Sequence, residues 1–305
     1  MKPKIIILAG PTASGKTGVA LELARRFRAA IVSADSIQIY RFMDIGSAKP
    51  SIEERQHVPH YMIDIKYPDE DFSAGDYVKE ARSIIGKIVE KSMVSLVVGG
   101  TGLYIRLLRG GIADLPKADL ELRSRLLEVY KKEGIEALTA RLQIVDPCAA
   151  KSIGSSNLVR ILRALEVFEL TGKPMSEFHN EHALRDCPYN TLFLGLNPDR
   201  EKLYQAIDDR VDSMIASGLL DEVRHLYNRG YGPELKPLQS IGYRHAGKVL
   251  SGQMTLLDAT ELMKKDTRHY AKRQLTWFRS EPDLRWFDPQ EISTIGVEVD
   301  NFLEH

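Results

Sequence analysis

One stretch constrains the fold more than any other: the complete G-x-x-x-x-G-K-[ST] phosphate-binding loop formed by Gly10, Pro11, Thr12, Ala13, Ser14, Gly15, Lys16 and Thr17. An apolar run at 5–8 and an amphipathic run at 19–27 flank it, which predicts a buried strand, the loop and a helix. Glycines allow backbone N–H groups and the helix N-terminus to face phosphate oxygens, Lys16 adds a cation, and the Thr17 hydroxyl can bind Mg²⁺. The alternative is a glycine-rich turn that binds nothing.

A second apolar run, 30–34, ends at Asp35 and Ser36. Ligands of an open parallel sheet gather at the carboxyl ends of its strands, so we expect both residues beside the phosphate loop. A carboxylate there suits a base that receives a proton from a nucleophile, or a ligand of Mg²⁺. Capping of the next segment is the structural alternative. Beyond it, 40–50 is expected to be a long exposed binding loop, 61–65 a strand and 76–90 a helix.

A third buried strand, 93–98, leads into Gly99-Gly100-Thr101-Gly102. P-loop hydrolases carry a Mg²⁺-binding Asp at the end of such a strand, and here glycines and a threonine take its place. Paired glycines permit close backbone approach to a ligand, which Thr101 could hydrogen-bond. A merely tight turn is the alternative.

The stretch from Pro116 onward predicts only helices, over 119–133, 135–143 and 157–171, and no strand between Gly111 and Asn190. A strand at 191–196 then resumes the sheet, and further helices follow. The expected fold is α/β: a P-loop NTPase-like parallel sheet flanked by helices, with an all-helical insertion domain. We place the catalytic core at 1–114 and 191–305 and the insertion at 115–190.

The charge balance of the chain restricts how it could bind nucleic acid. The 305 residues include 42 Lys and Arg and 42 Asp and Glu, so such a partner must meet a local basic patch. Helical spacing puts Lys265, Arg268, Lys272 and Arg279 on one face of a long helix predicted at 255–280. That face binds anions or is merely solvated, and the same two alternatives hold for Arg160 and Arg163.

Cysteine usage and the N-terminus bear on the compartment. Cys148 and Cys187 lack metal-ligand spacing and suit a reducing environment. The apolar run after Lys4 is too short for a signal peptide, and no run reaches membrane-spanning length. We expect a cytoplasmic protein with no membrane association.

Seven separated stretches together point to one family. They are GPTASGKT at 10–17, SADSIQIY at 33–40, MDIGSAKP at 43–50, VGGTGLY at 98–104, RALEVFELTGK at 163–173, SIGYR at 240–244 and KRQLTWFR at 272–279. In this combination and order, over nearly the full chain, they resemble the bacterial tRNA dimethylallyltransferases, or IPP transferases. One departure is local: Ser155-Ser156-Asn157-Leu158 replaces the family's usual Pro-Asn-Asp type of entry to the third helix.

The resemblance implies transfer of a dimethylallyl group from its diphosphate to the exocyclic amine of the adenosine 3′-adjacent to the anticodon of tRNA, with Mg²⁺ and release of diphosphate. The phosphate loop would hold the leaving diphosphate, so no machinery to activate water is needed. Lys16, Thr17 with Mg²⁺ and, by resemblance, Arg210 would take up negative charge. Asp35 would accept the amine proton, with Thr101 as its hydrogen-bonding neighbour.

The family pattern also implies residues that contact the anticodon stem-loop. They are Asp35, Ser36, Ile37, Gln38, Thr101, Arg123, Val159, Arg160, Ile161, Leu162, Arg163, Ile241, Gly242, Tyr243 and Arg244. We expect the protein to act as a monomer.

Two other functions would also use a phosphate loop. A small-molecule or nucleoside kinase would use Mg²⁺, ATP and the acidic residue after the second strand to activate a hydroxyl. A nucleotide-switched RNA-binding protein would bind RNA and hydrolyse nucleotide slowly, leaving Asp35 and Thr101 without a role.

Overall fold

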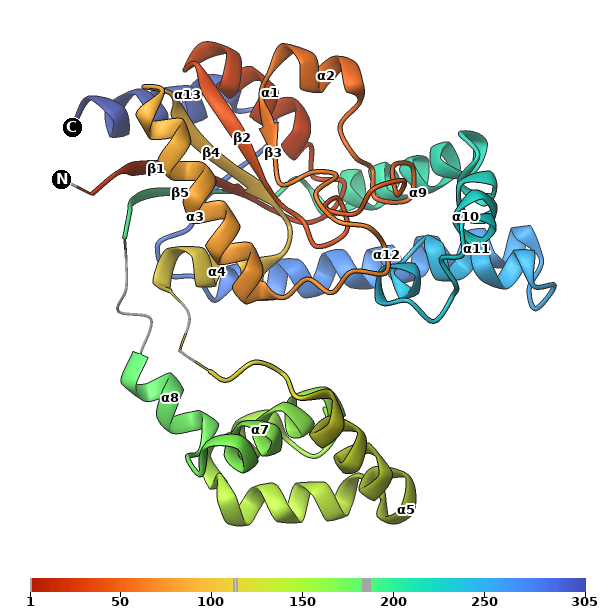
Figure 1. Ribbon diagram of the computed structural model, residues 1–305. Helices are drawn as coiled ribbons and strands as arrows, with labels where there is room; N and C mark the ends of the chain where they lie inside the picture. Colours follow the sequence, from red (N-terminus) through yellow and green to blue (C-terminus); the bar gives the residue numbers. More distant parts are fainter. Residues whose placement is uncertain (1, 112, 114, 183–187) are drawn as a thin grey trace. The chain divides into compact units, whose positions relative to one another are not determined.

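The computed structural model describes residues 2–111, 113, 115–182 and 188–305 and divides the chain into two compact units (Figure 1). One unit comprises Met1–Arg109 and Pro188–His305, and the other comprises Gly110–Cys187. The boundaries expected from the sequence, 114/115 and 190/191, lie a few residues further along the chain. Cys148 is exposed and unpaired, and Cys187 lies outside the described residues.

The first unit is built on a six-stranded parallel sheet in the order β3-β2-β4-β1-β5-β6. The strands are β1 (Lys4–Ala9), β2 (Ala29–Ala34), β3 (His60–Tyr61), β4 (Val94–Gly99), β5 (Asn190–Leu196) and β6 (Arg285–Phe287). Ala9 and Ala34 both pair with Gly99, so β1, β4 and β2 end at one level. The turns after these strands therefore leave the sheet side by side, as the sequence predicted for the phosphate loop and Asp35.

Helices cover both faces of this sheet (Figure 1). α3 (Ala74–Glu90) and α4 (Gly102–Gly110) pack on one face, with Tyr77 and Ile105 in a core that includes Ile5 and Ile7. α1 (Lys16–Arg26) and α13 (Ile292–Glu304) pack on the other, against Ile6 and Leu8. The alternation of adjacent β1 residues between two cores confirms a strand buried on both faces. A short helix, α2 (Ile52–His57), precedes β3.

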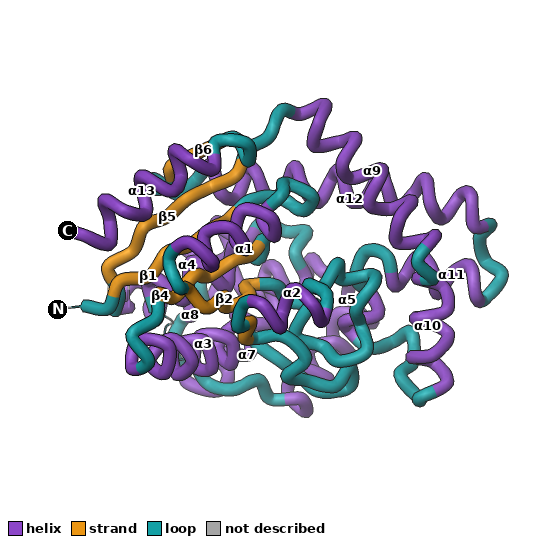
Figure 2. Tube along the Cα trace, turned by 90° about the horizontal axis from the view of Figure 1, so that it is seen from above, coloured by secondary structure: helices purple, strands orange, loops and turns teal. Residues whose placement is uncertain are grey.

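A group of helices extends to one side of the sheet (Figure 2). It comprises α9 (Arg200–Ala216), α10 (Leu219–Asn228), a 3₁₀ turn at Lys236–Gln239, α11 (Tyr243–Leu250) and α12 (Leu256–Arg279). A separate apolar core joins them to the loop that follows β2, through Ile39 and Met43. The last turns of α12 return to the sheet, where Phe278 is buried with α3 and α4 residues. The loop over 40–50 is irregular, as expected.

The second unit is helical throughout its described residues, as the sequence predicted. Its helices are α5 (Leu120–Val145), α6 (Pro147–Ile153), α7 (Leu158–Thr171) and α8 (Met175–His182). α5 kinks where Gly134 takes φ of 81°, which is the point at which the sequence predicted two helices to meet. α6 and α8 were not expected, although Asp146 caps α6 and Pro147 opens it.

One local expectation was wrong. The strand predicted over 61–65 stops at Tyr61, because Met62 and Asp64 take φ of 63° and 56° and break the extended pleat. Among the helices of the described residues, none has the length and apolar character needed to cross a membrane.

Candidate active site

The phosphate loop connects β1 to α1 as its sequence requires. Gly15, directly before the helix, takes φ of 82°, and Ala13 takes φ of 62°. A Cβ on Gly10 would lie 2.9 Å from the carbonyl oxygen of Leu196, so the loop has no space for a larger residue there. Among the described residues the buried Ser14 hydroxyl has no hydrogen-bond partner, and it lines a cavity over the loop. An unpaired buried donor in this position suits a phosphate oxygen.

Lys16 is half-buried beneath this cavity. Its Nζ donates hydrogen bonds to the carbonyl oxygens of Gly10 at 3.0 Å and Pro11 at 2.5 Å. Burial, and then the positive charge of Arg210, lowers the pKa of Lys16 to about 7, with Asp35 acting in the opposite direction. The ammonium group is therefore costly to keep charged until an anion enters.

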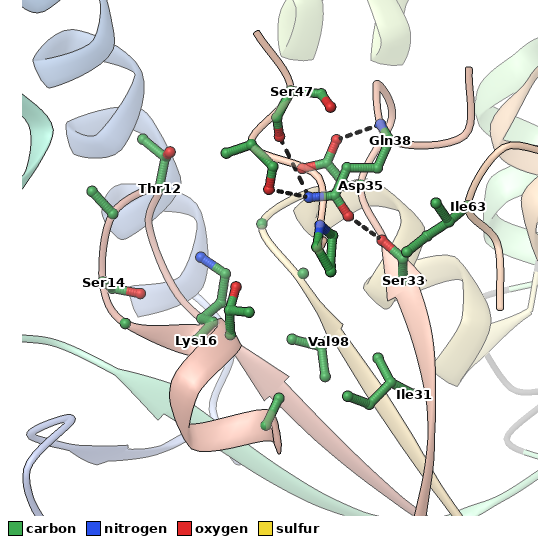
Figure 3. A pocket seen from close by; sticks show the side chains of 18 of the residues that line it. Thr12, Ser14, Lys16, Ile31, Ser33, Asp35, Gln38, Ser47, Ile63 and Val98 are labelled. Carbon is green, nitrogen blue, oxygen red and sulfur yellow. Dashed lines mark hydrogen bonds between the residues drawn. The ribbon is translucent and has the colours of Figure 1, made fainter. Parts of the chain in front are cut away.

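Asp35 stands across the cavity from the phosphate loop (Figure 3). Its Oδ1 accepts hydrogen bonds from the backbone N–H groups of Ile37 at 2.8 Å and Gln38 at 3.3 Å. Both bonds use one oxygen, so among the described residues Oδ2 is the oxygen left to accept a proton. Asp35 can therefore cap the following turn through Oδ1 and still accept a proton at Oδ2.

Thr101 ties the turn after β4 to the turn that carries Asp35. Its hydroxyl accepts a hydrogen bond from the Ser36 N–H at 3.2 Å, and its own N–H donates to the Ala34 carbonyl oxygen at 3.1 Å. Thr101 is thus bonded to the backbone of the residues directly before and after Asp35.

Arg210 reaches the same place from α9. Its Nη1 lies 3.4 Å from the Thr12 hydroxyl, and burial lowers its pKa while Asp35 opposes that shift. Tyr270 of α12, which the sequence analysis did not select, lines the cavity as well. Burial and then the charge of Asp35 raise the pKa of Tyr270 to about 12, so its hydroxyl stays protonated.

Two cavities meet at these residues. The first, of about 110 Å³, lies over the phosphate loop and is lined by Ser14, Lys16, Thr17 and Gln38. The second, of about 320 Å³, is lined by Ile37, Met214, Ile241 and Met263 together with arginines. The residues common to both are Thr12, Asp35, Ser47, Arg210 and Tyr270. A ligand in each cavity would meet the other beside Asp35 and Arg210.

The donor atoms of the first cavity suit a magnesium ion held jointly with phosphate. Thr17 is exposed and lines this cavity, directly after Lys16 in the loop. Among the described residues there is no group of three or more His, Cys, Asp or Glu side chains that could hold a metal. Mg²⁺ retains water and binds substrate phosphates with few protein ligands, so one hydroxyl beside a phosphate site fits it.

The residues that the resemblance implied for tRNA contact lie in two different settings. In the first unit, Ser36, Ile37, Ile241 and Arg244 line the second cavity with Asp35. Tyr243 is buried and its hydroxyl donates a hydrogen bond to Glu222, so its side chain has a structural role.

In the second unit, Val159 and Arg160 are exposed at the start of α7. Ile161 and Leu162 are buried in the core of this unit, which corrects the expectation that their side chains contact tRNA. Helical periodicity turns them to the side opposite Val159 and Arg160.

The two remaining arginines of the prediction form ion pairs with the buried Glu166. Arg123 and Arg163 each donate to Glu166 at 2.8 Å, and Arg163 also donates to the Pro116 carbonyl oxygen at 2.5 Å. Glu166 also accepts from the Asp119 N–H at 2.7 Å. Both arginine side chains remain partly exposed, so they can join a second anion while they hold the unit together.

The basic face predicted on α12 differs from the face that turns toward the cavities. Arg268 pairs with both oxygens of Asp208, at 2.6 and 2.7 Å, which uses its charge locally. Arg273 lines the second cavity instead, with Arg244. The periodicity of the sequence identified the basic face of α12. Which residues of α12 line the cavities is shown only by the packing of the helix against the rest of the unit.

The chain is similar in sequence to a family of known proteins. The family model "IPP transferase" matches residues 38–281. A tRNA dimethylallyltransferase of Syntrophobacter fumaroxidans is 51% identical over 295 residues, which is 97% of this chain and 86% of that protein.

Two solved structures are similar over nearly the whole chain. A tRNA isopentenylpyrophosphate transferase of Bacillus halodurans has a TM-score of 0.74 and 39% identity, covering 99% of this chain and 97% of its own. A eukaryotic dimethylallyltransferase acting on tRNA has a TM-score of 0.82 and 28% identity, covering 98% of this chain and 77% of its own. The family model covers well over half of the chain, and these similarities extend over nearly all of it, so the chain belongs to the IPP transferase family.

Proposed function

We propose that this protein is a tRNA dimethylallyltransferase, which transfers the dimethylallyl group of dimethylallyl diphosphate to the exocyclic amine of the adenosine 3′-adjacent to the anticodon. The observation that supports this most is that a cavity over a phosphate loop meets a second, larger cavity at a carboxylate and an arginine. Two substrates can enter from separate cavities and react between Asp35 and Arg210.

The donor occupies the cavity over the phosphate loop in this proposal. The bond between the allylic carbon and the diphosphate oxygen breaks, and diphosphate leaves with the electron pair. Negative charge grows on its oxygens, where the loop N–H groups, Lys16 and Arg210 stabilise it. Thr17 would hold Mg²⁺, which when bound supplies further positive charge to the diphosphate.

The acceptor adenosine occupies the second cavity. Its exocyclic nitrogen forms the new bond to the allylic carbon, and the proton it loses passes to Asp35. An aryl amine is a weak nucleophile, so close positioning of the two substrates contributes much of the rate. The base must first leave its stack, at a cost of a few kcal/mol.

The tRNA body would be held by both units. Ser36, Ile37, Ile241 and Arg244 line the acceptor cavity, while Arg160, with the partly exposed Arg123 and Arg163, offers phosphate contacts from the helical unit. The proposed working form is a monomer. With tRNA as the substrate, the compartment that we propose for the reaction is the cytoplasm.

The experiment that tests this function uses purified protein, Mg²⁺, radiolabelled dimethylallyl diphosphate and unmodified tRNA with adenosine 3′ to its anticodon. We expect label in the tRNA, mapped to that adenosine, and one diphosphate released per transfer. A parallel reaction contains ATP in place of the allylic donor.

Each alternative gives a different result in the same experiment. ATP consumption with a phosphorylated metabolite and no prenyl transfer would establish the kinase, to which the family match gives no support. RNA binding that depends on nucleotide, without covalent change to either partner, would establish the nucleotide-switched binder.

A further inference from the structure

Gln274 of α12 bridges two of the turns that form the active site. Its Oε1 accepts a hydrogen bond from the Thr12 N–H of the phosphate loop at 2.8 Å. Its Nε2 donates to the Gly100 carbonyl oxygen, in the turn after β4, at 2.9 Å. The side chain is 7% exposed and lines the first cavity. One amide thus joins segments that are 262 and 174 residues away in sequence.

The bridge continues to the turn that carries Asp35. Thr101, next to Gly100, donates its N–H to the Ala34 carbonyl oxygen and accepts from the Ser36 N–H. Asp35 lies between those two residues in the chain. The phosphate loop and the turn of the proposed base are therefore connected by hydrogen bonds through Gln274 and Thr101, joined by the peptide bond between Gly100 and Thr101.

The local packing is fitted to this amide. A Cβ on Gly100 would lie 2.3 Å from Gln274 Nε2, so only glycine lets the two approach. The Thr12 N–H needs an acceptor and the Gly100 oxygen needs a donor, and an uncharged amide supplies both. A carboxylate of the same length supplies acceptors only, which sets one of its oxygens against the Gly100 oxygen.

We infer that Gln274 is a positioning residue for the transfer: it fixes the separation between the diphosphate site and Asp35. This rests on the proposed function, in which the donor leaves from the phosphate loop and the amine proton goes to Asp35. A displacement of about 1 Å between reacting groups can lower a rate about 100-fold, so loss of the bridge should reduce the transfer step without weakening tRNA binding.

The test compares Gln274→Glu and Gln274→Leu with the unaltered chain. Single-turnover transfer is measured at saturating tRNA from about pH 6 to pH 8, with tRNA affinity and melting temperature measured in parallel. We expect both variants to be about 100-fold slower at pH 8 and to bind tRNA within twofold of the parent.

The transfer rates at the acidic end of the pH profile distinguish a positioning role of Gln274 from a role in packing alone. At low pH the glutamic acid of Gln274→Glu can donate to the Gly100 oxygen while accepting from Thr12, so its rate should recover toward the parent. Gln274→Leu cannot recover. The charged and titratable side chains of this cavity are the same in both variants, so their contribution to the profile is common to both: Lys16, Asp35, His60, Arg210 and Tyr270.

Thr276→Ala is the matched control, because Thr276 is exposed on the same helix and its hydroxyl bonds to the Lys272 carbonyl oxygen. We expect it to retain the parental rate. Parental rates in Gln274→Glu at pH 8, or identical pH profiles for the two Gln274 variants, would overturn the inference. If Gln274→Leu does not fold, the profile of Gln274→Glu against the parent decides. Absence of transfer by the parent would instead remove the proposed function.

Discussion

The protonation state of Lys16 couples binding of the diphosphate substrate to proton uptake. Its amino group is buried and bonded to two carbonyl oxygens of its own loop, and its pKa lies at about 7. An entering diphosphate is an opposite charge and raises this pKa, so at pH 8 binding takes up a proton. Affinity for the donor should therefore fall as pH rises above about 7, where more of the free protein has lost that proton.

Calorimetry in buffers of different ionisation enthalpy measures this uptake directly. Dimethylallyl diphosphate is titrated into the protein without tRNA at pH 8, where phosphate groups with a pKa near about 6 are ionised. We expect uptake approaching one proton per donor bound, and none in Lys16→Met. Equal uptake by the two proteins would show that another group is responsible.

Asp35 combines a structural and a chemical role that two substitutions can separate. Asparagine keeps an oxygen for the N–H groups of Ile37 and Gln38 but cannot take up the amine proton. Loss of a general base costs about 10²- to 10⁴-fold in rate, so Asp35→Asn should slow single-turnover transfer within that range while tRNA affinity is kept. Asp35→Ala should lose the turn as well and weaken tRNA binding. A normal rate in Asp35→Asn would exclude Asp35 as the base.

At the scale of elements, Glu222 of α10 holds the loop over 43–50 in place. Its carboxylate accepts hydrogen bonds from the N–H groups of Asp44 at 2.9 Å, Ile45 at 2.7 Å and Gly46 at 3.1 Å, and from the Tyr243 hydroxyl at 2.7 Å. Gly46 lines the second cavity, so the order of this loop shapes the acceptor site.

Glu222→Ala should release that loop. Hydrogen bonds to a charged group contribute about 1.5–3 kcal/mol each and share one carboxylate here, so we expect a loss of about 3 kcal/mol in the free energy of unfolding. Amide hydrogen exchange at Ile45 and Gly46 should accelerate, and the KM for tRNA should rise. Asp221→Ala, at an exposed neighbour on the same helix, should change none of these. Slow exchange that persists in Glu222→Ala would contradict this account.

The sequence predicted the elements whose causes are local. The phosphate loop is set by its own glycines, and the break in α5 by Gly134, so both were foreseen. The roles of Gln274 and Glu222 were not, because each depends on backbone groups more than 170 residues away in sequence. Hydrogen-bonding side chains of this kind have no periodic signal; only the packed fold shows which backbone groups they meet.

On the scale of the whole molecule, the two units have separate cores. The helical unit buries Leu126, Leu138 and Leu165 in its apolar core, and Glu166 has no exposed surface. Burial raises the pKa of Glu166, but hydrogen bonds from Arg163 and Arg123 outweigh it, so the pKa of Glu166 is lowered overall. A lowered carboxyl pKa stabilises the fold above the pKa of the unfolded chain, and this stability is lost as pH falls.

Glu166→Gln should destabilise the helical unit at neutral pH. Removing one partner of a buried ion pair costs about 3–5 kcal/mol, and the partly exposed arginines favour the lower end. The difference in unfolding free energy from the parent should shrink on acidification, since Glu166 of the unfolded parent then takes up a proton, which favours the unfolded state. Denaturant unfolding at about pH 7 and pH 4 measures it. Glu169→Gln, which affects the more exposed pair with Arg141, is the control and should cost less than about 1 kcal/mol.

The two cavities belong to one of the two units. The unit made of Met1–Arg109 and Pro188–His305 contains the sheet and every residue that lines the two cavities. Replacing Gly110–Cys187 with a flexible Gly/Ser linker should therefore leave donor binding and its proton uptake intact. The lost arginines include Arg160, Arg163 and Arg123, so the slope of log affinity for tRNA against log salt should become shallower by about 2. If tRNA affinity and its salt slope stay unchanged, the unit that contains the sheet binds the tRNA without the helical unit. If donor binding is lost, the unit that contains the sheet requires the helical unit in order to fold.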